Sequence, residues 1–488
     1  MDTNVLKSLK RKAVTGTKWT TISTIISTVT QMIQLIVLTQ LLKPSDFGLM
    51  GMVMVVIGFA SMFADMGISN ALIYKQDNTQ DKLSSLYWLN IITGIAVFLF
   101  IWSCTPLIAG FYNEPRIMGL MFWVALTFPI ASLGQQFQVL MQKELRFNWL
   151  AKVEIWSAIA GLIVSVVCAF LGNGVMSLVW GQLSKTAAKT FALVAMGLKI
   201  WQPSFYYSNK GIKEYVEFGF YQMGERSINY LNSNWDYIFI GKLLGAEALG
   251  YYTMAFNLIA IPVNKINPTV DRVAFPIFAK VSSDLECLKH GYFKMLKLLN
   301  LINFPMLMGL LVTAPYAIPL IFGKQWIPSI PLVQILALMG LLRSIGNPVS
   351  ILLLAKGRAD LGFKWNVMLM ITQIPGIYLG VHFGGTLGAA AAFLILQSIY
   401  AVLIYLVLIR AVLGKCLTGY LNSIWPALWT SGLMAIVVFI CGTGIALVSL
   451  DSVFYFQVLI GLIFYTALIL SFNRNLVDEV KKMVFSRF

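Results

Sequence analysis

The sequence contains few charged residues. Only 11% of its 488 residues are Asp, Glu, Lys or Arg, whereas apolar types make up 58%. A soluble domain carries about 25% charged residues, so this chain has too little charge to cover a water-facing surface. The composition therefore predicts that most of the chain lies in a membrane.

Histidine and cysteine are also sparse. The two histidines, His290 and His382, are far apart, and the five cysteines are scattered without a CxxC pair. Zinc sites and disulfide frameworks need clusters of these residues. We therefore expect no metal site and no bound cofactor.

Long apolar stretches recur along nearly the whole chain. Each is long enough to cross a bilayer as a helix, for which roughly 20 residues suffice, and we count about fourteen of them. The predicted segments are 17–42, 47–67, 85–110, 118–140, 150–171, 176–198, 214–243, 249–270, 293–322, 329–354, 361–383, 386–413, 423–448 and 453–472. The first is too long for a signal peptide, so we expect it to be retained. The predicted class is an all-α integral membrane protein.

The basic residues lie mainly in the loops between these segments. If the N-terminus is cytoplasmic, 27 Lys and Arg fall on the cytoplasmic side and 4 on the opposite side. Cytoplasmic loops carry an excess of Lys and Arg, so this alternation predicts that both termini are cytoplasmic. The net charge of +16 is thereby explained by topology, and no nucleic-acid partner is expected.

A faint internal repeat divides the chain. Residues 41–48 align with 243–250 without a gap, so that Gly48 falls on Gly250 and Met52 on Met254. An even number of predicted segments separates the copies, which makes the repeat parallel. The predicted organisation is a first six-helix bundle (1–198), a linker (199–213), a second six-helix bundle (214–413), and two further helices with a basic tail (414–488).

Two segments carry a stripe of polar residues at helical spacing. Segment 17–42 has Thr24, Gln31 and Gln34 on one face, and segment 214–243 has Asn229 and Asn232. Residues three and four apart lie on one side of a helix. We expect both stripes to line a wet cavity; the alternative is that they form hydrogen bonds between helices.

Charged residues within the predicted segments are mostly basic. The five cations are Lys185, Lys189, Arg226, Lys265 and Arg343. The acids at comparable depth are fewer: Glu225 and Asp236, with Asp65 and Glu154 near cytoplasmic ends. A charge at mid-helix costs about 2.5–3.5 kcal/mol on insertion scales, which makes each a candidate for function. The excess of cations predicts an anionic ligand such as a pyrophosphate. The alternative is that Arg226 and Arg343 pair with acids and hold helices in register.

Several tryptophans lie near the ends of predicted segments, where interfacial anchors are common. They are Trp19, Trp88, Trp102, Trp326 and Trp425. We interpret them as anchors in the headgroup region rather than as a surface for stacking sugars.

A series of short motifs runs along most of the chain: PSDFGL (44–49), DMGI (65–68), LYWLN (86–90), GQQF (134–137), MQKELRFN (141–148), INYLN (228–232), PVNKINP (262–268), RVAFPIFAK (272–280), GLLRSIGNP (340–348) and AKGRAD (355–360). Over about residues 10–430 the sequence resembles the polysaccharide-exporting flippases of the multidrug/oligosaccharidyl-lipid/polysaccharide superfamily, in particular the colanic-acid-exporter branch. Lys265 and Arg343 lie inside these motifs, whereas Lys185 and Lys189 do not. The resemblance fades in the last two segments.

The resemblance implies two six-helix bundles around a central cavity in the cytoplasmic (inner) membrane. It implies translocation of an undecaprenyl-pyrophosphate-linked oligosaccharide repeat unit by alternating access, with Na⁺ or H⁺ as coupling ion. Lys185, Lys189, Arg226, Lys265 and Arg343 would then bind the substrate. The implied partners are this lipid-linked substrate, membrane lipids, and a polysaccharide polymerase with its chain-length regulator.

Three other functions stay open at this point. A drug/cation antiporter of the same superfamily would need more acids than cations in its cavity, which is the reverse of the balance here. A lipid II-type flippase shares the expected architecture. A membrane-embedded glycosyltransferase or polymerase would need a large outer loop with catalytic acids or histidines, and the predicted outer loops are short.

Overall fold

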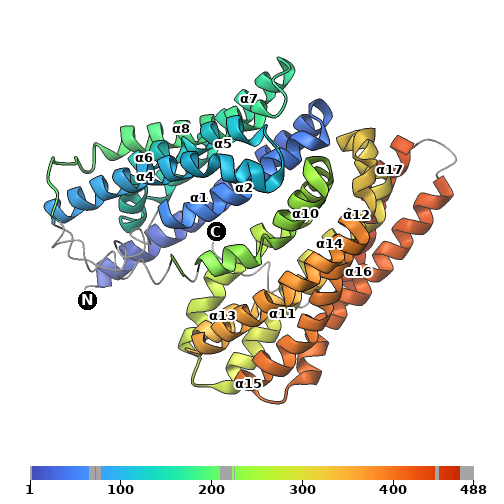
Figure 1. Ribbon diagram of the computed structural model, residues 1–488. Coiled ribbons are helices and arrows are strands. Elements are labelled where there is room, and N and C mark those ends of the chain that lie inside the picture. Colours follow the sequence, from blue (N-terminus) through green and yellow to red (C-terminus); the bar gives the residue numbers. More distant parts are fainter. Residues whose placement is uncertain are drawn as a thin grey trace. The chain divides into compact units, whose positions relative to one another are not determined.

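The computed structural model describes residues 3–64, 72, 79–208, 223–224, 226–445 and 450–472 (Figure 1). Most of these residues are helical, and none of them is in a strand. The α-helices are α1 (Thr3–Leu41), α2 (Pro44–Ala64), α4 (Gln80–Tyr112), α5 (Ile117–Ala125), α6 (Thr127–Lys143), α7 (Phe147–Phe170), α8 (Met176–Gly197), α10 (Trp235–Lys280), α11 (Leu285–Ala317), α12 (Ile330–Gly346), α13 (Val349–Ala355), α14 (Ala359–Leu403), α15 (Arg410–Leu413), α16 (Leu417–Ile445) and α17 (Leu450–Phe472). Short π- and 3₁₀-helical turns lie at η1 (Ile318–Phe322), η2 (Lys324–Ser329) and η3 (Ile404–Ile409).

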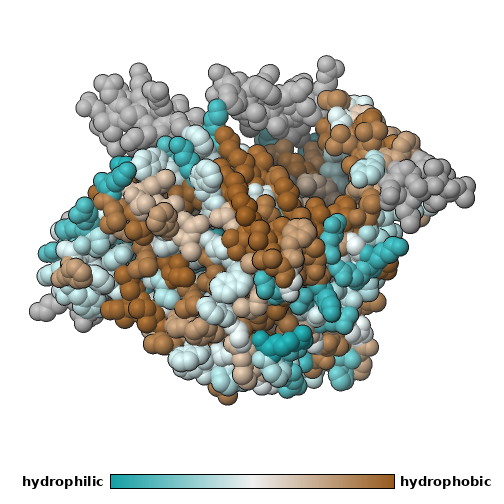
Figure 2. Space-filling view, turned by 90° about the horizontal axis from the view of Figure 1, so that it is seen from above, coloured by the Kyte–Doolittle hydropathy of each residue, from teal (hydrophilic) through white to brown (hydrophobic). Residues whose placement is uncertain are grey.

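The described helices have the lengths and apolar surfaces of membrane spans. Ten helical stretches are long and apolar enough to cross a membrane. Large apolar side chains face outward, for example Phe100, Phe191 and Phe383 at 69%, 77% and 82% exposure, and Figure 2 shows much of one face covered by hydrophobic residues. A surface of this kind is suited to lipid. The predicted all-α membrane class is confirmed, whereas the number of fourteen spans stays a prediction.

Two long helices are interrupted at glycines. Gly245 in α10 has φ 83° and ψ −175°, and Gly385 in α14 has φ 58° and ψ −142°. A residue with a side chain rarely adopts such a positive φ. Gly385 lies between the predicted segments 361–383 and 386–413, so the 54-residue stretch 360–413 provides two of the predicted segments. Gly245 likewise separates the predicted segments 214–243 and 249–270.

The chain forms two compact units, Met1–Gly250 and Tyr251–Phe488. In the first, α7 packs against α1 and α8, and α6 packs against α4 and α8. In the second, α11 packs against α12, α16 and α17, and α14 packs against α12. The bundle and linker boundaries drawn from the sequence stay a prediction.

The two copies of the repeat meet inside the first unit. A Cβ atom built on Gly48 would overlap the carbonyl oxygen of Ala246, and one built on Gly250 would overlap that of Pro44. Both pairs connect aligned positions, since 250 − 48 and 246 − 44 are both 202. The contact is therefore reciprocal, as expected for two copies related by a pseudo-two-fold axis. The turn is shared as well, because Gly245 aligns with Lys43, which lies between α1 and α2.

The segment after α8 is held against the start of α4. Trp88 donates its indole N–H to the carbonyl of Ser204 (2.9 Å), and Trp201 donates to the Gln80 side chain (2.6 Å). The Ser84 and Ser204 hydroxyls lie 2.8 Å apart. These bonds fix part of the predicted linker, residues 201–204, to the first unit. They also show that Trp88 of the LYWLN motif is a structural contact.

We expect Trp88→Phe to loosen this segment while the ring packing remains. The change removes one hydrogen bond, worth about 1 kcal/mol. The measurement is limited proteolysis of the purified protein, where cleavage within 199–213 should become faster. Trp102→Phe, on the same helix and 53% exposed, is the matched control and should leave the cleavage rate unchanged. Equal cleavage rates in both variants would refute the role given to Trp88.

Candidate functional site

Lys185 and Lys189 lie on the inward side of α8 in the first unit. Both side chains are half-buried, while Phe191 is 77% exposed. Two residues along a helix turn the side chain by about 200°, so Lys189 and Phe191 are on opposite faces. The two lysines thus point away from the apolar surface that suits lipid, as expected for intramembrane cations.

One acidic residue lies beside these lysines. The Lys189 ammonium and the Glu154 carboxylate of α7 are 3.9 Å apart, with side-chain exposures of 35% and 38%. Within the described part of the chain, Lys185 forms no ion pair. The three residues therefore leave one positive charge uncompensated inside the helical bundle. The role of these lysines in binding an anionic substrate stays a prediction.

Small residues set the position of Lys185. A Cβ on Gly161 of α7 would lie 3.0 Å from the Lys185 Cβ, and one on Gly181 of α8 would lie 2.6 Å from the Ser165 Cβ. The backbones of α7 and α8 can approach closely only because both positions lack side chains. The base of Lys185 is thereby fixed against α7.

The polar stripe of α1 faces α7, at least at Gln34. The Gln34 amide donates to the Ser165 hydroxyl (3.0 Å), and the Thr24 hydroxyl donates to the backbone carbonyl of Thr20 (2.8 Å). Gln31 is half-buried. Gln34 therefore forms a hydrogen bond between helices, which is the alternative to lining a wet cavity. The cavity-lining role of the stripe stays a prediction.

Buried amide pairs join helices in both units. In the first unit, the Asn90 amide of α4 donates to the Gln136 amide oxygen of α6 (3.5 Å). In the second, the Asn303 amide of α11 donates to the Asn267 amide oxygen of α10 (3.0 Å). The Ser344 hydroxyl of α12 donates to the amide oxygen of Asn300 (3.3 Å). The sequence reasoning missed these groups, although the spacing of Asn300 and Asn303 within an apolar segment was a usable signal.

The other predicted site residues are distributed over both units. Arg226 is exposed, Asn229 is half-buried, and Asn232 and Asp236 are 8% and 2% exposed, all in the first unit. Arg343 is half-buried on α12 in the second unit. Glu225, Asp65 and the side chain of Lys265 lie outside the described residues. Among the predicted cations whose side chains are described, Lys185 and Lys189 lie one turn apart on α8 of the first unit.

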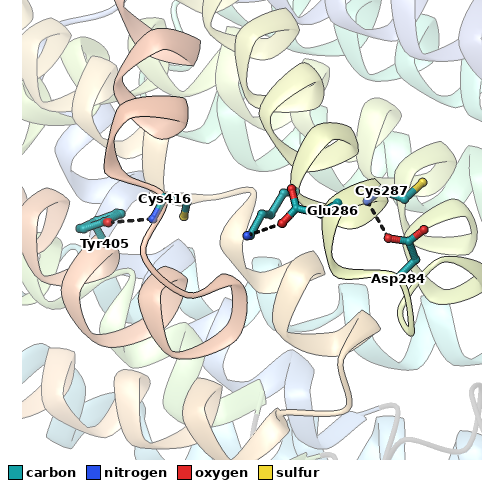
Figure 3. Close-up of polar contacts among 6 residues, drawn as sticks. Asp284, Glu286, Cys287, Tyr405 and Cys416 are labelled. Carbon is teal, nitrogen blue, oxygen red and sulfur yellow. Dashed lines mark hydrogen bonds and ion pairs between the residues drawn. The ribbon is translucent and has the colours of Figure 1, made fainter.

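The cytoplasmic end of α11, in the orientation predicted from the loop charges, is held by local polar contacts (Figure 3). The Asp284 carboxylate caps the helix by accepting from the Cys287 backbone N–H (3.0 Å), and Lys289 pairs with Glu286 (2.7 Å). Nearby, the Cys416 backbone N–H donates to the Tyr405 hydroxyl (3.3 Å). An N-cap carboxylate satisfies N–H groups that a helix end leaves free. These contacts fix the start of the helix that carries Asn300 and Asn303.

Within the described residues, no group of three or more His, Cys, Asp or Glu side chains could hold a metal ion. The site is instead made of lysines, one glutamate and neutral polar groups. Such a set can attract an anion and can form hydrogen bonds with sugar hydroxyls.

Comparison with solved structures defines the class. The lipid II flippase MurJ in an inward closed conformation superposes with a TM-score of 0.76 at 15% sequence identity, covering 93% of this chain and 99% of that one. At this identity the likeness concerns the fold alone. The fold is thus that of a multi-helix membrane transporter.

Sequence comparison places the chain more narrowly. The polysaccharide biosynthesis protein family matches residues 37–331, and the chain belongs to this family. The lipopolysaccharide biosynthesis protein WzxC of Escherichia coli (strain K12) is 36% identical, covering 87% of this chain and 86% of the relative. The teichuronic acid biosynthesis protein TuaB of Bacillus subtilis (strain 168) is 37% identical, covering 89% and 90%. The resemblance to the polysaccharide-exporting flippases is confirmed.

Proposed function

We propose that the protein is a flippase that moves an undecaprenyl-pyrophosphate-linked oligosaccharide repeat unit across the cytoplasmic membrane by alternating access. The observation that carries the proposal is the family membership, since a relative 36% identical over 87% of the chain is a lipopolysaccharide biosynthesis protein. The relative from Bacillus subtilis is a teichuronic acid biosynthesis protein. The pathway served here is therefore the assembly of an exopolysaccharide or lipopolysaccharide.

The cationic surface formed by Lys185 and Lys189 supports an anionic substrate. In this proposal the two lysines, with Arg226, Lys265 and Arg343, attract the pyrophosphate. The polar side chains Thr24, Gln31, Gln34, Asn229 and Asn232 contact the sugars. The polyprenyl tail stays in the hydrocarbon core of the bilayer throughout the cycle, so the protein does not have to bind or desolvate it.

The remaining features of the proposal concern topology and partners. The 27-to-4 division of loop charges supports cytoplasmic termini. The protein is a transporter without catalytic residues of its own, and a polymerase with its chain-length regulator uses the translocated unit. Glu225, Asp236 and Asp65 are the acids proposed for coupling to Na⁺ or H⁺.

A lipid II-type flippase is the second candidate, because the superposition on MurJ is extensive. The sequence favours the first candidate, since identity is 36% to WzxC and 15% to MurJ. A drug/cation antiporter is disfavoured by the uncompensated charge beside Glu154, which would repel a cationic drug.

Depletion of the protein in cells tests the proposal. We expect the lipid-linked repeat unit to accumulate on the cytoplasmic face of the membrane while polymer export stops. Membrane-impermeant periodate should then oxidise the sugars in inside-out vesicles and spare them in right-side-out vesicles. Accumulation on the outer face would point instead to a polymerase defect, and accumulation of lipid II would favour the second candidate.

A further inference from the structure

Asp271 of α10 is an acidic residue that the proposed function leaves unused. One of its carboxylate oxygens is buried and has no hydrogen-bond partner among the described residues. By contrast, Glu154 pairs with Lys189 and Asp360 pairs with Arg358. A buried carboxylate oxygen without a partner is costly, so its retention calls for an explanation.

Three asparagines, which we call the amide cluster (Asn267, Asn300 and Asn303), lie on α10 and α11 within one or two helical turns of the level of Asp271. Asn267 and Asn303 are joined by a hydrogen bond of 3.0 Å. Further along, Phe278 of α10 would contact a Cβ on Gly291 of α11 at 3.2 Å, so the two helices run antiparallel. Asp271 lies one turn beyond Asn267, and Asn300 lies one turn from Asn303 in the same direction. By this register the carboxylate and the three amides lie within about two turns along α10 and α11, and Asn300 also contacts Ser344 of α12.

The amide cluster is fully buried and only partly satisfied. Asn300 and Asn303 are 0% exposed, and Asn267 is 4% exposed. The Asn303 oxygen and the Asn267 and Asn300 nitrogens have no partner in the described part of the chain. The Asn267 oxygen is occupied by its bond to Asn303, which leaves the Asn303 oxygen to face other groups. A 180° rotation of the Asn300 amide would present a second oxygen, because the Ser344 hydroxyl can donate to the Leu341 carbonyl and accept from the rotated amide. Such oxygens are the ligands that hard cations prefer.

The depth and charge of the position suit a cation. The part of α10 after Gly245 extends for roughly 50 Å, longer than the hydrocarbon core of about 30 Å, and Asp271 lies just beyond the predicted span 249–270. Burial raises the pKa of the Asp271 carboxyl to about 6. Lys297 lies one turn beyond Asn300 on α11, yet no ion pair joins it to Asp271 within the described residues. Among the described side chains, none therefore neutralises this carboxylate.

We propose that Asp271 and the amide cluster bind a hard monovalent cation, for which Na⁺ is the probe. The carboxylate supplies one negative charge and the amides supply neutral oxygens. A single carboxylate suits a monovalent ion, because sites for divalent cations usually contain several. The site would bind the coupling ion of the proposed flippase. Only this coupling role rests on the proposed function, whereas cation binding itself does not.

Thermal unfolding of the purified full-length protein tests the site. The midpoint is measured as NaCl replaces choline chloride at constant ionic strength and pH. Ligand that binds only the folded state raises the midpoint, by roughly 2–4 °C for each kcal/mol in a chain of moderate size. We expect a saturable rise in the wild type and its loss in Asp271→Asn. Asp360→Asn, which removes an exposed acid paired with Arg358, should retain the rise.

Asn303→Leu is the second variant, because it removes a buried oxygen without changing charge. Each variant is compared with its own midpoint in choline, so a general loss of stability does not obscure the Na⁺ effect. The proposal is overturned if the wild type shows no Na⁺-specific rise, or if the rise persists in both Asp271→Asn and Asn303→Leu. This binding measurement needs no substrate. Its failure would leave the flippase function standing, and failed flipping would leave a confirmed cation site standing.

Discussion

Replacing Gly48 by alanine is expected to reduce polymer export at least tenfold without loss of protein from the membrane. The added Cβ would lie 2.6 Å from the carbonyl carbon of Ala246, and the obstructing atoms belong to the backbone. Overpacking of this kind costs about 1–3 kcal/mol, and 1.4 kcal/mol corresponds to a tenfold change in an equilibrium. In the proposed orientation the contact lies near the extracytoplasmic ends of the helices. That side must close once in every transport cycle.

The repeat makes the same prediction for Gly250. A Cβ on Gly250 would lie 2.6 Å from the carbonyl carbon of Pro44, so Gly250→Ala should reduce export at least tenfold as well. Gly119→Ala is the matched control, because a Cβ on this helical residue meets no described heavy atom within 4 Å. The assay measures exported polymer at equal protein level. Export by Gly48→Ala equal to that by Gly119→Ala would remove this contact from the mechanism.

Replacing Lys185 by glutamine is expected to have the second-largest effect, a loss of export of about tenfold or more. The lysine carries the uncompensated charge beside Glu154 and Lys189, and one charge-assisted bond to an anion contributes roughly 1.5–3 kcal/mol. Lys185→Arg should retain most of the export because it keeps the charge. Lys364→Gln, at an exposed position of α14, is the control for surface charge.

A double variant separates the role of charge from a role in packing. Glu154→Gln would free Lys189 from its 3.9 Å contact, so Lys185→Gln/Glu154→Gln restores the net charge of the cluster. We expect this double variant to export more polymer than Lys185→Gln alone. If Lys185→Arg is as inactive as Lys185→Gln and the double variant is no better, the residue acts through shape or packing.

The sequence predicted the helical organisation well because the governing signal is local. Apolar runs of span length appear as helices, and the turn aligned between Lys43 and Gly245 lies where the repeat predicted it. The reciprocal contact of Gly48 and Gly250 could not be read from the sequence, since it depends on how two distant segments pack. In the sequence, the one sign of this contact is that Gly48 and Gly250 occupy aligned positions of the repeat.

Side-chain environments were predicted less well. Trp326 is 0% exposed and packs against Tyr251, so its interpretation as an interfacial anchor is wrong. Trp102 and Trp425 are 53% and 62% exposed, as an anchor should be. Proximity to a helix end does not reveal which side of the helix faces neighbouring helices. The same limit applies to Gln34, whose partner Ser165 lies on α7.

The hydropathy pattern did not identify Asp271 as a candidate site residue. The predicted segment 249–270 ends one residue before Asp271, so the sequence pattern assigns this acid to the loop that follows. In the structure α10 continues to Lys280 and the carboxylate is partly buried against its neighbours. Hydropathy changes where a helix leaves the bilayer and not where the helix ends. The end of α10 at Lys280 is therefore visible only in the structure.

Flipping by the purified protein in proteoliposomes tests the central claim most directly. Vesicles containing the lipid-linked repeat unit in both leaflets are treated with impermeant periodate, and the protected fraction is followed over time. The account predicts that wild-type protein exposes the inner pool to oxidation, whereas Gly48→Ala and protein-free vesicles keep it protected. An inner pool that stays protected with the wild type, with and without a Na⁺ or pH gradient, would contradict the account.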